Sequence, residues 1–372
     1  MKRFLMVLMA FLTACSSIPG FVPVEDSQLI RADVQRSTAP DLEEQQVSNL
    51  VRGNSSFAFD LFHQAAANST ENLIFSPYSI SLAFSMVYAG ARGDTEAEMA
   101  DVLHFQPQDS QHSAFNALDL YFENLGKEDV SEQNQEEQGD PFQLNIANSV
   151  WGQEGYPFLD EFLEILAAEY GAGLRPADFV NNPNAEREKI NNWIEEETEE
   201  RIKDMIPPDG VITPATRMVL VNAIYFKAGW LNEFSKPATQ EAPFTLLDGS
   251  QVNAEMMHNS ELKVNYLQGD GFQAAVLPYV GNRTGMLIIL PEEDRYSEIE
   301  SALSPEMLQS VLNDAEYESI IFAMPKIDFE TDLDLIEHLQ PMGLQKPFSG
   351  EADFSGIAGN RDLFISAALH KA

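Results

Sequence analysis

The 372-residue chain is 44% hydrophobic and strongly acidic, with 22 lysine and arginine residues against 59 aspartate and glutamate residues. A chain of this length can bury a large core, in one domain or in two. Its formal net charge of -37 repels phosphate backbones and anionic polymers. The composition therefore excludes nucleic acid and heparin-like molecules as partners and favours an acidic, highly soluble surface.

The N-terminus has the layout of a secretory signal peptide. Lys2 and Arg3 precede an apolar run over residues 4–12, which is too short to span a bilayer permanently. Residues 12–15 read Leu-Thr-Ala-Cys and resemble a bacterial lipobox, in which the chain is cleaved before the cysteine and the cysteine carries lipid. Cys15 is the only cysteine, so it cannot form an internal disulfide.

These features predict a signal peptide over residues 1–14 and lipid attachment at Cys15. The protein would then be exported and anchored to the membrane of a bacterial envelope, facing the periplasm or the exterior. The alternative is an ordinary signal peptide cut nearby, with Cys15 incidental. Residues 15–46 mix proline, serine, glutamine and charges without apolar periodicity, which predicts a flexible tether before a domain over residues 47–372.

The first elements of the domain are marked at their ends. Residues 72–75 predict a short strand, and Ser76 followed by Pro77 predicts the start of an apolar helix that continues to Ala89. Thr95 and Glu98 have the spacing of a capping box, which predicts the start of a second helix. Residues 123–140 are so acidic and so poor in apolar residues that they predict a solvated loop.

The second half of the chain alternates predicted helices and strands, without a repeat period. A helical pattern covers residues 190–205, and the apolar run over residues 219–226 predicts a strand buried on both faces, in which Asn222 needs hydrogen-bond partners. Further strands are predicted at 274–277, 286–290, 319–323 and 364–369, and further helices at 299–312 and 333–339.

Sequence signals for catalysis and cofactor binding are weak. The chain has no nucleophile elbow, zinc-protease motif or phosphate-binding loop, and its six histidines lack metal-ligand spacing. Gly269-Asp270-Gly271 begins a loose match to a dinucleotide fingerprint, but the residues after it read as a strand, which favours a hairpin turn. We expect no enzyme activity, no cofactor and no metal site.

Several ordered segments together resemble the serpins, the family of serine protease inhibitors. The resemblance covers nearly everything after the tether. The segments that carry it are residues 72–80 (Asn-Leu-Ile-Phe-Ser-Pro-Tyr-Ser-Ile), 90–95 (Gly-Ala-Arg-Gly-Asp-Thr), 102–105, 147–151, 190–193 (Ile-Asn-Asn-Trp), 222–227 (Asn-Ala-Ile-Tyr-Phe-Lys), 277–279, 325–326, 342–344, 352–356 and 370–372 (His-Lys-Ala).

The resemblance implies an α+β serpin fold with three β-sheets and about eight or nine helices. It also implies a mechanism, in which an exposed reactive loop offers a bait bond to a serine or cysteine protease. The protease forms an acyl-enzyme with the loop, and the cut loop inserts into the main sheet before the acyl bond is hydrolysed. The target protease would be the partner of this protein, besides the membrane.

The resemblance also assigns conformational roles to particular residues. Ser76, Ser79, Asn222 and His370 match the shutter, the polar cluster that opens for the new strand, and Trp230 matches the breach, where insertion begins. The simpler interpretation is that these groups satisfy one another's hydrogen bonds and gate nothing. Neither interpretation gives them a role in catalysis.

In the family, the hinge and reactive loop follow the His-Lys-Ala segment, which is residues 370–372 here. We therefore expect this chain to be a truncated form without the loop and the C-terminal strands, and to be unstable or inactive alone. One alternative is a non-inhibitory serpin-fold lipoprotein that binds a partner or has a structural role. Another is an enzyme on an unrecognised fold, which the missing nucleophile and metal sets disfavour.

Overall fold

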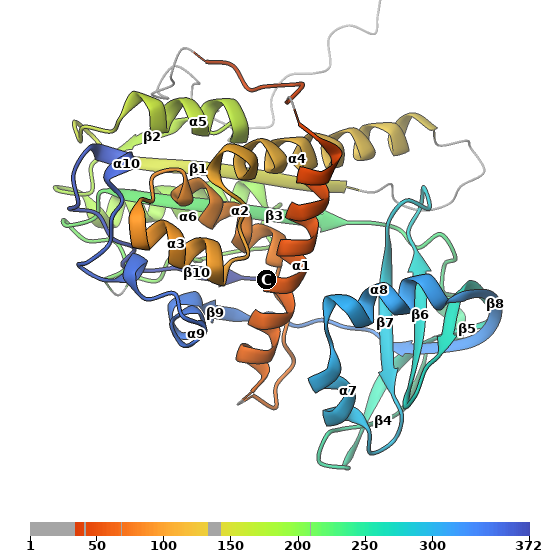
Figure 1. The fold of residues 1–372 in the computed structure, drawn as a ribbon. Helices are drawn as coiled ribbons and strands as arrows, with labels where there is room; N and C mark the ends of the chain where they lie inside the picture. The colour runs from red at the N-terminus through yellow and green to blue at the C-terminus, as the bar shows by residue number, and fades with distance from the viewer. Residues whose placement is uncertain (1–33, 41, 68, 133–142, 209) are drawn as a thin grey trace, which may run out of the picture.

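A computed structural model describes residues 34–40, 42–67, 69–132, 143–208 and 210–372. Cys15 and the predicted signal peptide lie outside the described residues, as does the greater part of the predicted tether. Helices and strands are arranged around one large helical core and a separate five-stranded sheet (Figure 1). In the described part of the chain, no helix is both long and apolar enough to cross a membrane.

Four helices from the first third of the chain form the centre of the molecule. They are α1 (Glu44–Ala66), α2 (Pro77–Tyr88), α3 (Gly93–Val102) and α4 (Gln108–Glu132). The main hydrophobic core forms around α2, most of whose residues are buried, including Ile80, Phe84 and Met86. Pro77 stands at the first helical position and Ser76 caps the helix, as the sequence predicts.

The first sheet has the order β2-β1-β3, so β1 pairs with a strand on each of its edges. Its strands are β1 (Gln143–Gln153), β2 (Leu174–Ala177) and β3 (Met218–Lys227). β1 runs antiparallel to β3, from the pair Gln143↔Lys227 to the pair Gly152↔Met218. Two helices flank this sheet, α5 (Asp160–Tyr170), which leads into β2, and α6 (Pro183–Glu197), which leads into β3.

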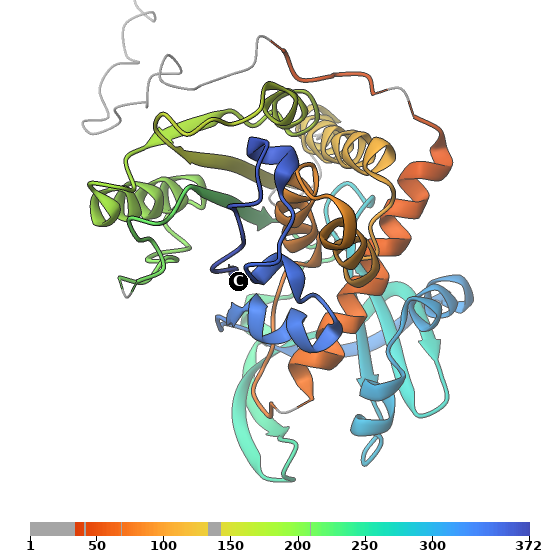
Figure 2. The same cartoon turned by 60° about the vertical axis from the view of Figure 1, so that its left-hand side comes forward.

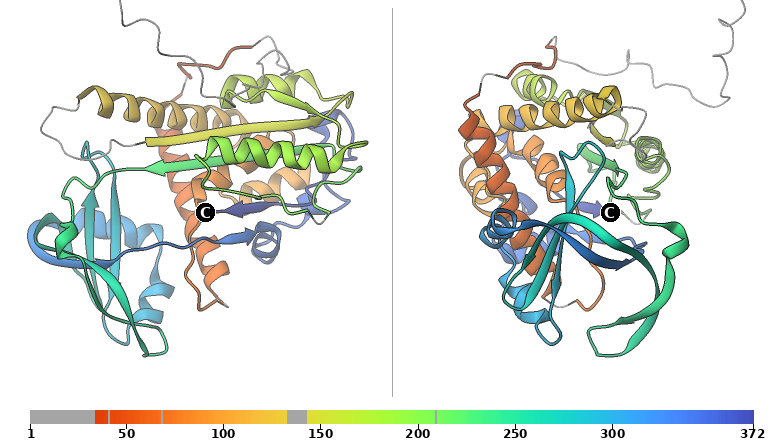
Figure 3. Two further views of the ribbon diagram at one scale, coloured as in Figure 1. Left: turned by 180° about the vertical axis from the view of Figure 1, so that it is seen from behind. Right: turned by 90° about the vertical axis from the view of Figure 1, so that its right-hand side faces the viewer.

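Helix α6 lies across the outer face of β1 and β3, as Figure 3 shows from behind. It buries Ile190, Trp193 and Ile194 against Trp151 of β1 and Val221 of β3. The guanidinium of the β2 residue Arg175 lies 5.5 Å from each of the two tryptophan rings. Burial of this apolar stripe explains why the helix predicted over residues 190–205 is observed as far as Glu197, whereas residues 198–205 lie outside the helix.

The second sheet has the order β4-β5-β6-β7, with β8 on the other edge of β5. Its strands are β4 (Gln240–Thr245), β5 (Gln251–Gln268), β6 (Phe272–Pro278), β7 (Gly285–Pro291) and β8 (Glu316–Pro325). Two helices, α7 (Tyr296–Ala302) and α8 (Pro305–Asp314), pack on this sheet through Ile299 and Val311. Residues 269–271 form the predicted hairpin turn, in which Gly271 adopts a φ of 79°.

The C-terminal part returns to the helical half of the molecule. It contains β9 (Asp332–Asp334), α9 (Leu335–Met342), α10 (Ser355–Ala358) and β10 (Leu369–Lys371), and β10 pairs with β9. Short 3₁₀ turns lie at Lys236–Ala238 and Lys346–Phe348. Figure 2 shows the end of the chain in the middle of the molecule, between β3 and the five-stranded sheet.

The predicted α+β class with three sheets is confirmed, and several element boundaries are corrected. Residues 72–75 form no strand, because no described strand pairs with them, although Ile74 N donates to Thr331 Oγ1 over 3.1 Å. Helix α3 begins at Gly93, so Thr95 lies inside the helix, where its hydroxyl accepts a bond from Asp353 N rather than capping the helix.

Three further boundaries differ from the predictions. The acidic stretch predicted as a loop continues α4 as far as Glu132, since glutamate and lysine are good helix formers. The single helix predicted at 299–312 is two helices, because Ser304 and Pro305 begin a new one. The strand predicted at 364–369 begins only at Leu369, because a cavity separates the preceding residues from β3.

Candidate functional site

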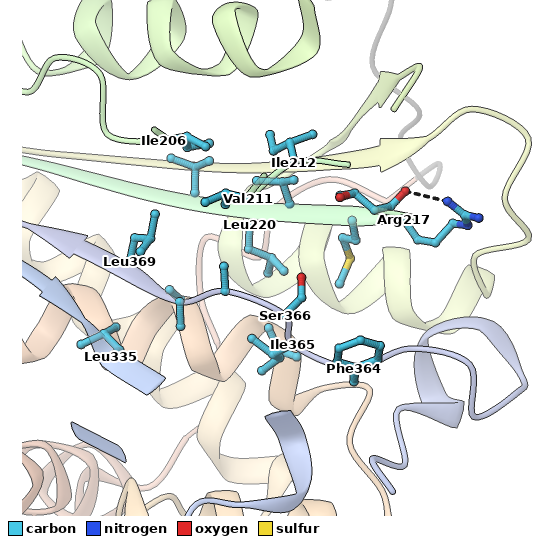
Figure 4. Close-up of a pocket in the computed structure, with 18 of the residues that line it drawn as sticks. Ile206, Val211, Ile212, Arg217, Leu220, Leu335, Phe364, Ile365, Ser366 and Leu369 are labelled. Carbon is cyan, nitrogen blue, oxygen red and sulfur yellow. Dashed lines mark hydrogen bonds between the residues drawn. The ribbon is translucent and has the colours of Figure 1, made fainter. Parts of the chain in front are cut away.

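An apolar cavity of about 580 Å³ lies between β3 and the C-terminal residues 362–370. Figure 4 shows Leu220 of β3 on one side of this cavity and Ile365 of the C-terminal segment on the other. Most of the residues that line it come from α2, β3, the linker over residues 205–217 and the C-terminal segment, and a few come from α6, β9, α9 and the region of α10. We call this space the β3 cavity.

Strand β3 presents an open edge to the β3 cavity. Its other edge pairs with β1 along ten residues, whereas no described strand pairs with the edge that faces residues 362–370. An unpaired edge offers a row of backbone N–H and C=O groups to an incoming strand. Neighbouring strands in a sheet lie roughly 4.8 Å apart. The β3 cavity is therefore a place where the sheet could accept an additional strand.

Three of the four predicted shutter residues meet at the α2 end of this cavity. The backbone N–H of Ser79 donates to Ser76 Oγ over 3.2 Å, and the backbone N–H of Ser76 donates to His370 Nε2 over 3.0 Å. Ser79 and His370 also line the cavity. The fourth residue, Asn222, stands on β3 opposite Asn148, but its side chain lies outside the described ones.

Burial makes the His370 imidazole a neutral hydrogen-bond acceptor. The side chain is only 8% exposed, and desolvation lowers its pKa from 6.5 to about 4. Since Nε2 accepts the bond from Ser76 N, the proton of the neutral ring is on Nδ1. The backbone of His370 pairs with Leu333 of β9, so this contact joins α2 to the C-terminal strands.

The predicted breach residue Trp230 lies elsewhere. Its indole stacks on the Tyr279 ring with centroids 5.0 Å apart, and Trp230 forms an isolated β-bridge with Tyr279. Phe234 meets the same indole edge-on. Trp230 does not line the β3 cavity. Its role in starting strand insertion stays a prediction.

The linker between α6 and β3 closes the outer side of the cavity and was not assigned a role from the sequence. Ile206, Val211 and Ile212 of this linker line the cavity. Asn191 of α6 holds the linker in place, since its Nδ2 donates to Ile206 O and its Oδ1 accepts from Ile206 N, both over 2.9 Å. Asn191 belongs to the Ile-Asn-Asn-Trp segment at 190–193, and this motif is the sequence signal that could have indicated its role.

The described residues contain a buried polar network that could be mistaken for a catalytic constellation. The Tyr170 hydroxyl lies 2.6 Å from His112 Nδ1 and 2.7 Å from Ser85 Oγ. All three side chains are buried, and desolvation lowers the pKa of His112 to about 4. The network joins α2, α4 and α5 and offers no route to a substrate. Within the described ranges, no group of three or more potential metal ligands was found.

The geometry thus combines an open edge of β3, an apolar cavity beside it, a linker held by Asn191 of α6 and the serine-capped helix α2. The model of the serpin (serine protease inhibitor) family matches residues 52–372. The chain belongs to the serpin family, and the predicted serpin fold is confirmed.

Curated relatives and solved structures agree with this assignment. The chain is 34% identical to an uncharacterized serpin-like protein of Thermococcus kodakarensis, over 98% of this chain and 83% of that protein. It is also 34% identical to the leukocyte elastase inhibitor of Equus caballus, over 87% of this chain and 85% of the inhibitor. The structure resembles emu ovalbumin with a TM-score of 0.78 and 28% identity, over 87% of this chain and 85% of ovalbumin.

Proposed function

We propose that this protein inhibits serine proteases, or cysteine proteases, by inserting a cleaved reactive loop as a new strand into the β3 cavity. The cavity carries the proposal, because it joins an unpaired strand edge to an apolar space of about 580 Å³. Membership of the serpin family and the similarity to leukocyte elastase inhibitor support it. Serpins are in general protease inhibitors rather than enzymes.

The proposed reaction begins as ordinary proteolysis. The nucleophilic oxygen or sulfur of the protease attacks the carbonyl carbon of the bait bond, and the peptide nitrogen leaves with a proton. The loop is then attached to the protease by an acyl bond. Insertion of the loop beside β3 before water can attack this bond carries the protease away from its starting position and distorts its active site.

The family places the reactive loop after the segment that is residues 370–372 here, so the experiment supplies a loop of known specificity. Residues 47–372 are joined to the segment that follows the corresponding position in the equine leukocyte elastase inhibitor. This chimaera is incubated with leukocyte elastase and separated by denaturing electrophoresis. We expect a complex that survives detergent, because the acyl bond is trapped.

A matched variant tests whether the cavity is responsible. Ala368→Arg places a long charged side chain in the cavity lining, and we expect elastase to cleave this chimaera without forming a stable complex. Cleavage of both chimaeras without a complex would contradict the inhibitor proposal. That result would favour the alternative, a non-inhibitory serpin-fold protein, for which the similarity to ovalbumin is the supporting observation.

We also propose that Cys15 carries lipid and anchors the protein to a bacterial envelope. The basic start, the apolar run over residues 4–12 and the Leu-Thr-Ala-Cys pattern support this location. The wild-type protein and a Cys15→Ser variant are expressed in a bacterial host and fractionated. We expect Cys15→Ser to leave the membrane fraction, and unchanged membrane fractionation would contradict lipid attachment.

A further inference from the structure

An apolar face of the β4–β5 hairpin is open to solvent. The cross-strand register pairs Phe244 with Val252 and, two residues nearer the base, Ala242 with Ala254, so all four side chains share one face. Phe244 and Val252 are 41% and 44% exposed, and Leu247 in the turn is 61% exposed. Both views of Figure 3 show the hairpin extending from the five-stranded sheet. We call Phe244, Leu247 and Val252 the hairpin patch.

Most of the charged side chains around the hairpin patch are acidic. Glu241 and Glu255 face each other across the base of the hairpin, and Asp248 lies in its turn. Asp248 Oδ1 accepts bonds from Ser250 Oγ over 2.6 Å and from Ser250 N over 2.9 Å, which lower the pKa of this carboxyl and keep it ionised. Lys326 Nζ lies 3.2 Å from Glu255 Oε2 and offsets one of the three charges. A surface that complements the hairpin patch is therefore apolar with a basic rim.

The end of β10 points toward the base of this hairpin. Thr331 N donates to Ala372 O over 2.8 Å, and Ala372 N donates to Thr331 O over 3.0 Å. Continuation of this antiparallel ladder would put the fifth residue after Ala372 opposite Lys326, roughly 17 Å along the strand. Lys326 N in turn donates to Glu255 O over 2.9 Å. The reactive loop, which the family places after residues 370–372, would therefore leave the sheet beside the β4–β5 hairpin.

We propose that the hairpin patch is a docking surface for the protease that binds the reactive loop. The inference rests on the proposed function, since that function brings a protease to the loop. From Glu255 to the turn, the hairpin spans roughly 14 Å, whereas a protease domain of about 200 residues has a radius of gyration of about 16 Å. A protease that holds the bait bond is thus large enough to reach the patch.

This contact would add selectivity beyond the bait bond. Apolar side chains buried at the centre of an interface contribute much of its affinity, and charges at the rim guide the approach of the partner. The hairpin patch would therefore favour proteases that carry an apolar area with a basic rim beside the active-site cleft. Two proteases that cleave the same bait sequence would be distinguished by this second surface.

The test measures docking without cleavage. The chimaera with the leukocyte elastase inhibitor segment is immobilised, and binding of leukocyte elastase, with its nucleophilic serine replaced by alanine, is measured by surface plasmon resonance. We expect Leu247→Ser and Phe244→Ser each to raise Kd at least fivefold, because each removes apolar area that docking buries. Leu312→Ser replaces a leucine of α8 that is 46% exposed, and this matched control should change Kd less than twofold.

Other occupants of the hairpin patch give different results. Equal Kd values for Leu247→Ser, Phe244→Ser and Leu312→Ser would overturn the docking surface. A chimaera that sediments as a dimer, and as a monomer after Leu247→Ser, would identify the patch as an interface between copies and would also overturn it. A melting temperature lowered by Leu247→Ser but not by Leu312→Ser would mean that the added C-terminal segment covers the patch, with the same consequence.

The docking measurement separates this inference from inhibition itself, because docking of inactive elastase requires no loop insertion. Elastase that docks with the expected differences in Kd, but is not trapped by the chimaera in its active form, would count against the inhibitory function alone. A trapped complex combined with equal Kd values would count against the hairpin patch alone.

Discussion

Asn191 offers the sharpest test of how the β3 cavity is closed. Its side chain makes two bonds of 2.9 Å to the backbone of Ile206, and both residues are buried, with exposed fractions of 5% and 6%. In an Asn191→Ala variant, Ile206 O keeps a bond of 3.1 Å from Arg187 Nη1, whereas Ile206 N–H loses its partner. The loss is therefore one unpaired donor and one weakened acceptor.

The expected cost follows from these contacts. A buried donor left without a partner costs about 1–3 kcal/mol, so we expect Asn191→Ala to lower the free energy of unfolding by roughly 2 kcal/mol. Urea unfolding is followed by tryptophan fluorescence, to which Trp193, on the same helix and 8% exposed, contributes. Asn192→Ala is the matched control, because Asn192 is exposed, and its effect should stay within about 0.5 kcal/mol.

The same variant should also loosen the linker over the cavity. We expect the chimaera with the leukocyte elastase inhibitor loop to insert its cleaved loop faster when Asn191 is replaced, because Asn191 then no longer holds Ile206 of the linker against α6. Equal unfolding free energies for Asn191→Ala and Asn192→Ala would refute this reasoning. It would mean that solvent, or a shift of the linker, satisfies Ile206 N–H without cost.

Two further predictions concern the contacts on the inner side of the cavity. The folded-state pKa of His370, about 4, lies below its unfolded value of 6.5, so its stabilising contribution is present above pH 6.5 and is lost as the pH falls through about 4. Between pH 7 and pH 4, the free energy of unfolding should therefore fall by up to about 3 kcal/mol more in the wild type than in a His370→Gln variant, as measured by urea unfolding. An identical pH dependence of the two proteins would contradict a neutral, buried His370. At Gly90, an added Cβ would lie 2.1 Å from Ile357 Cγ1, so Gly90→Ala should lower the free energy of unfolding by about 1–3 kcal/mol. Gly350 has open space around it, so Gly350→Ala should leave the stability nearly unchanged. Thermal melts of both variants measure the difference, and equal melting temperatures would contradict the tight packing at Gly90.

Local sequence patterns determined many of the elements. Ser76 and Pro77 define the start of α2 in the chain itself, because a hydroxyl cap and a fixed proline φ act within one turn. The continuous apolar run of β3 likewise needs no knowledge of its partners. The ordered segments that resemble serpins predicted the fold, since a long match constrains the whole topology at once. Those segments also singled out Ser76, Ser79 and His370, which lie close together in the structure.

Other features depended on residues far apart in the chain, and local patterns could not reveal them. Residues 72–75 read as a strand but have no described partner, and strand formation requires one. Residues 364–368 read as a strand too, yet the β3 cavity keeps them away from β3. The role of Asn191 required the position of Ile206, which the linker brings back onto α6.

The sequence by itself determined the acidic charge, the helix starts and the family, because composition, caps and ordered motifs are properties of the chain alone. Only the tertiary structure showed the open edge of β3, the neutral His370 near it, and the bonds of Arg36 to α4 and of Ser37 to α5. Each of these depends on burial and on distances between residues far apart in sequence. Such contacts arise only when the whole core has packed.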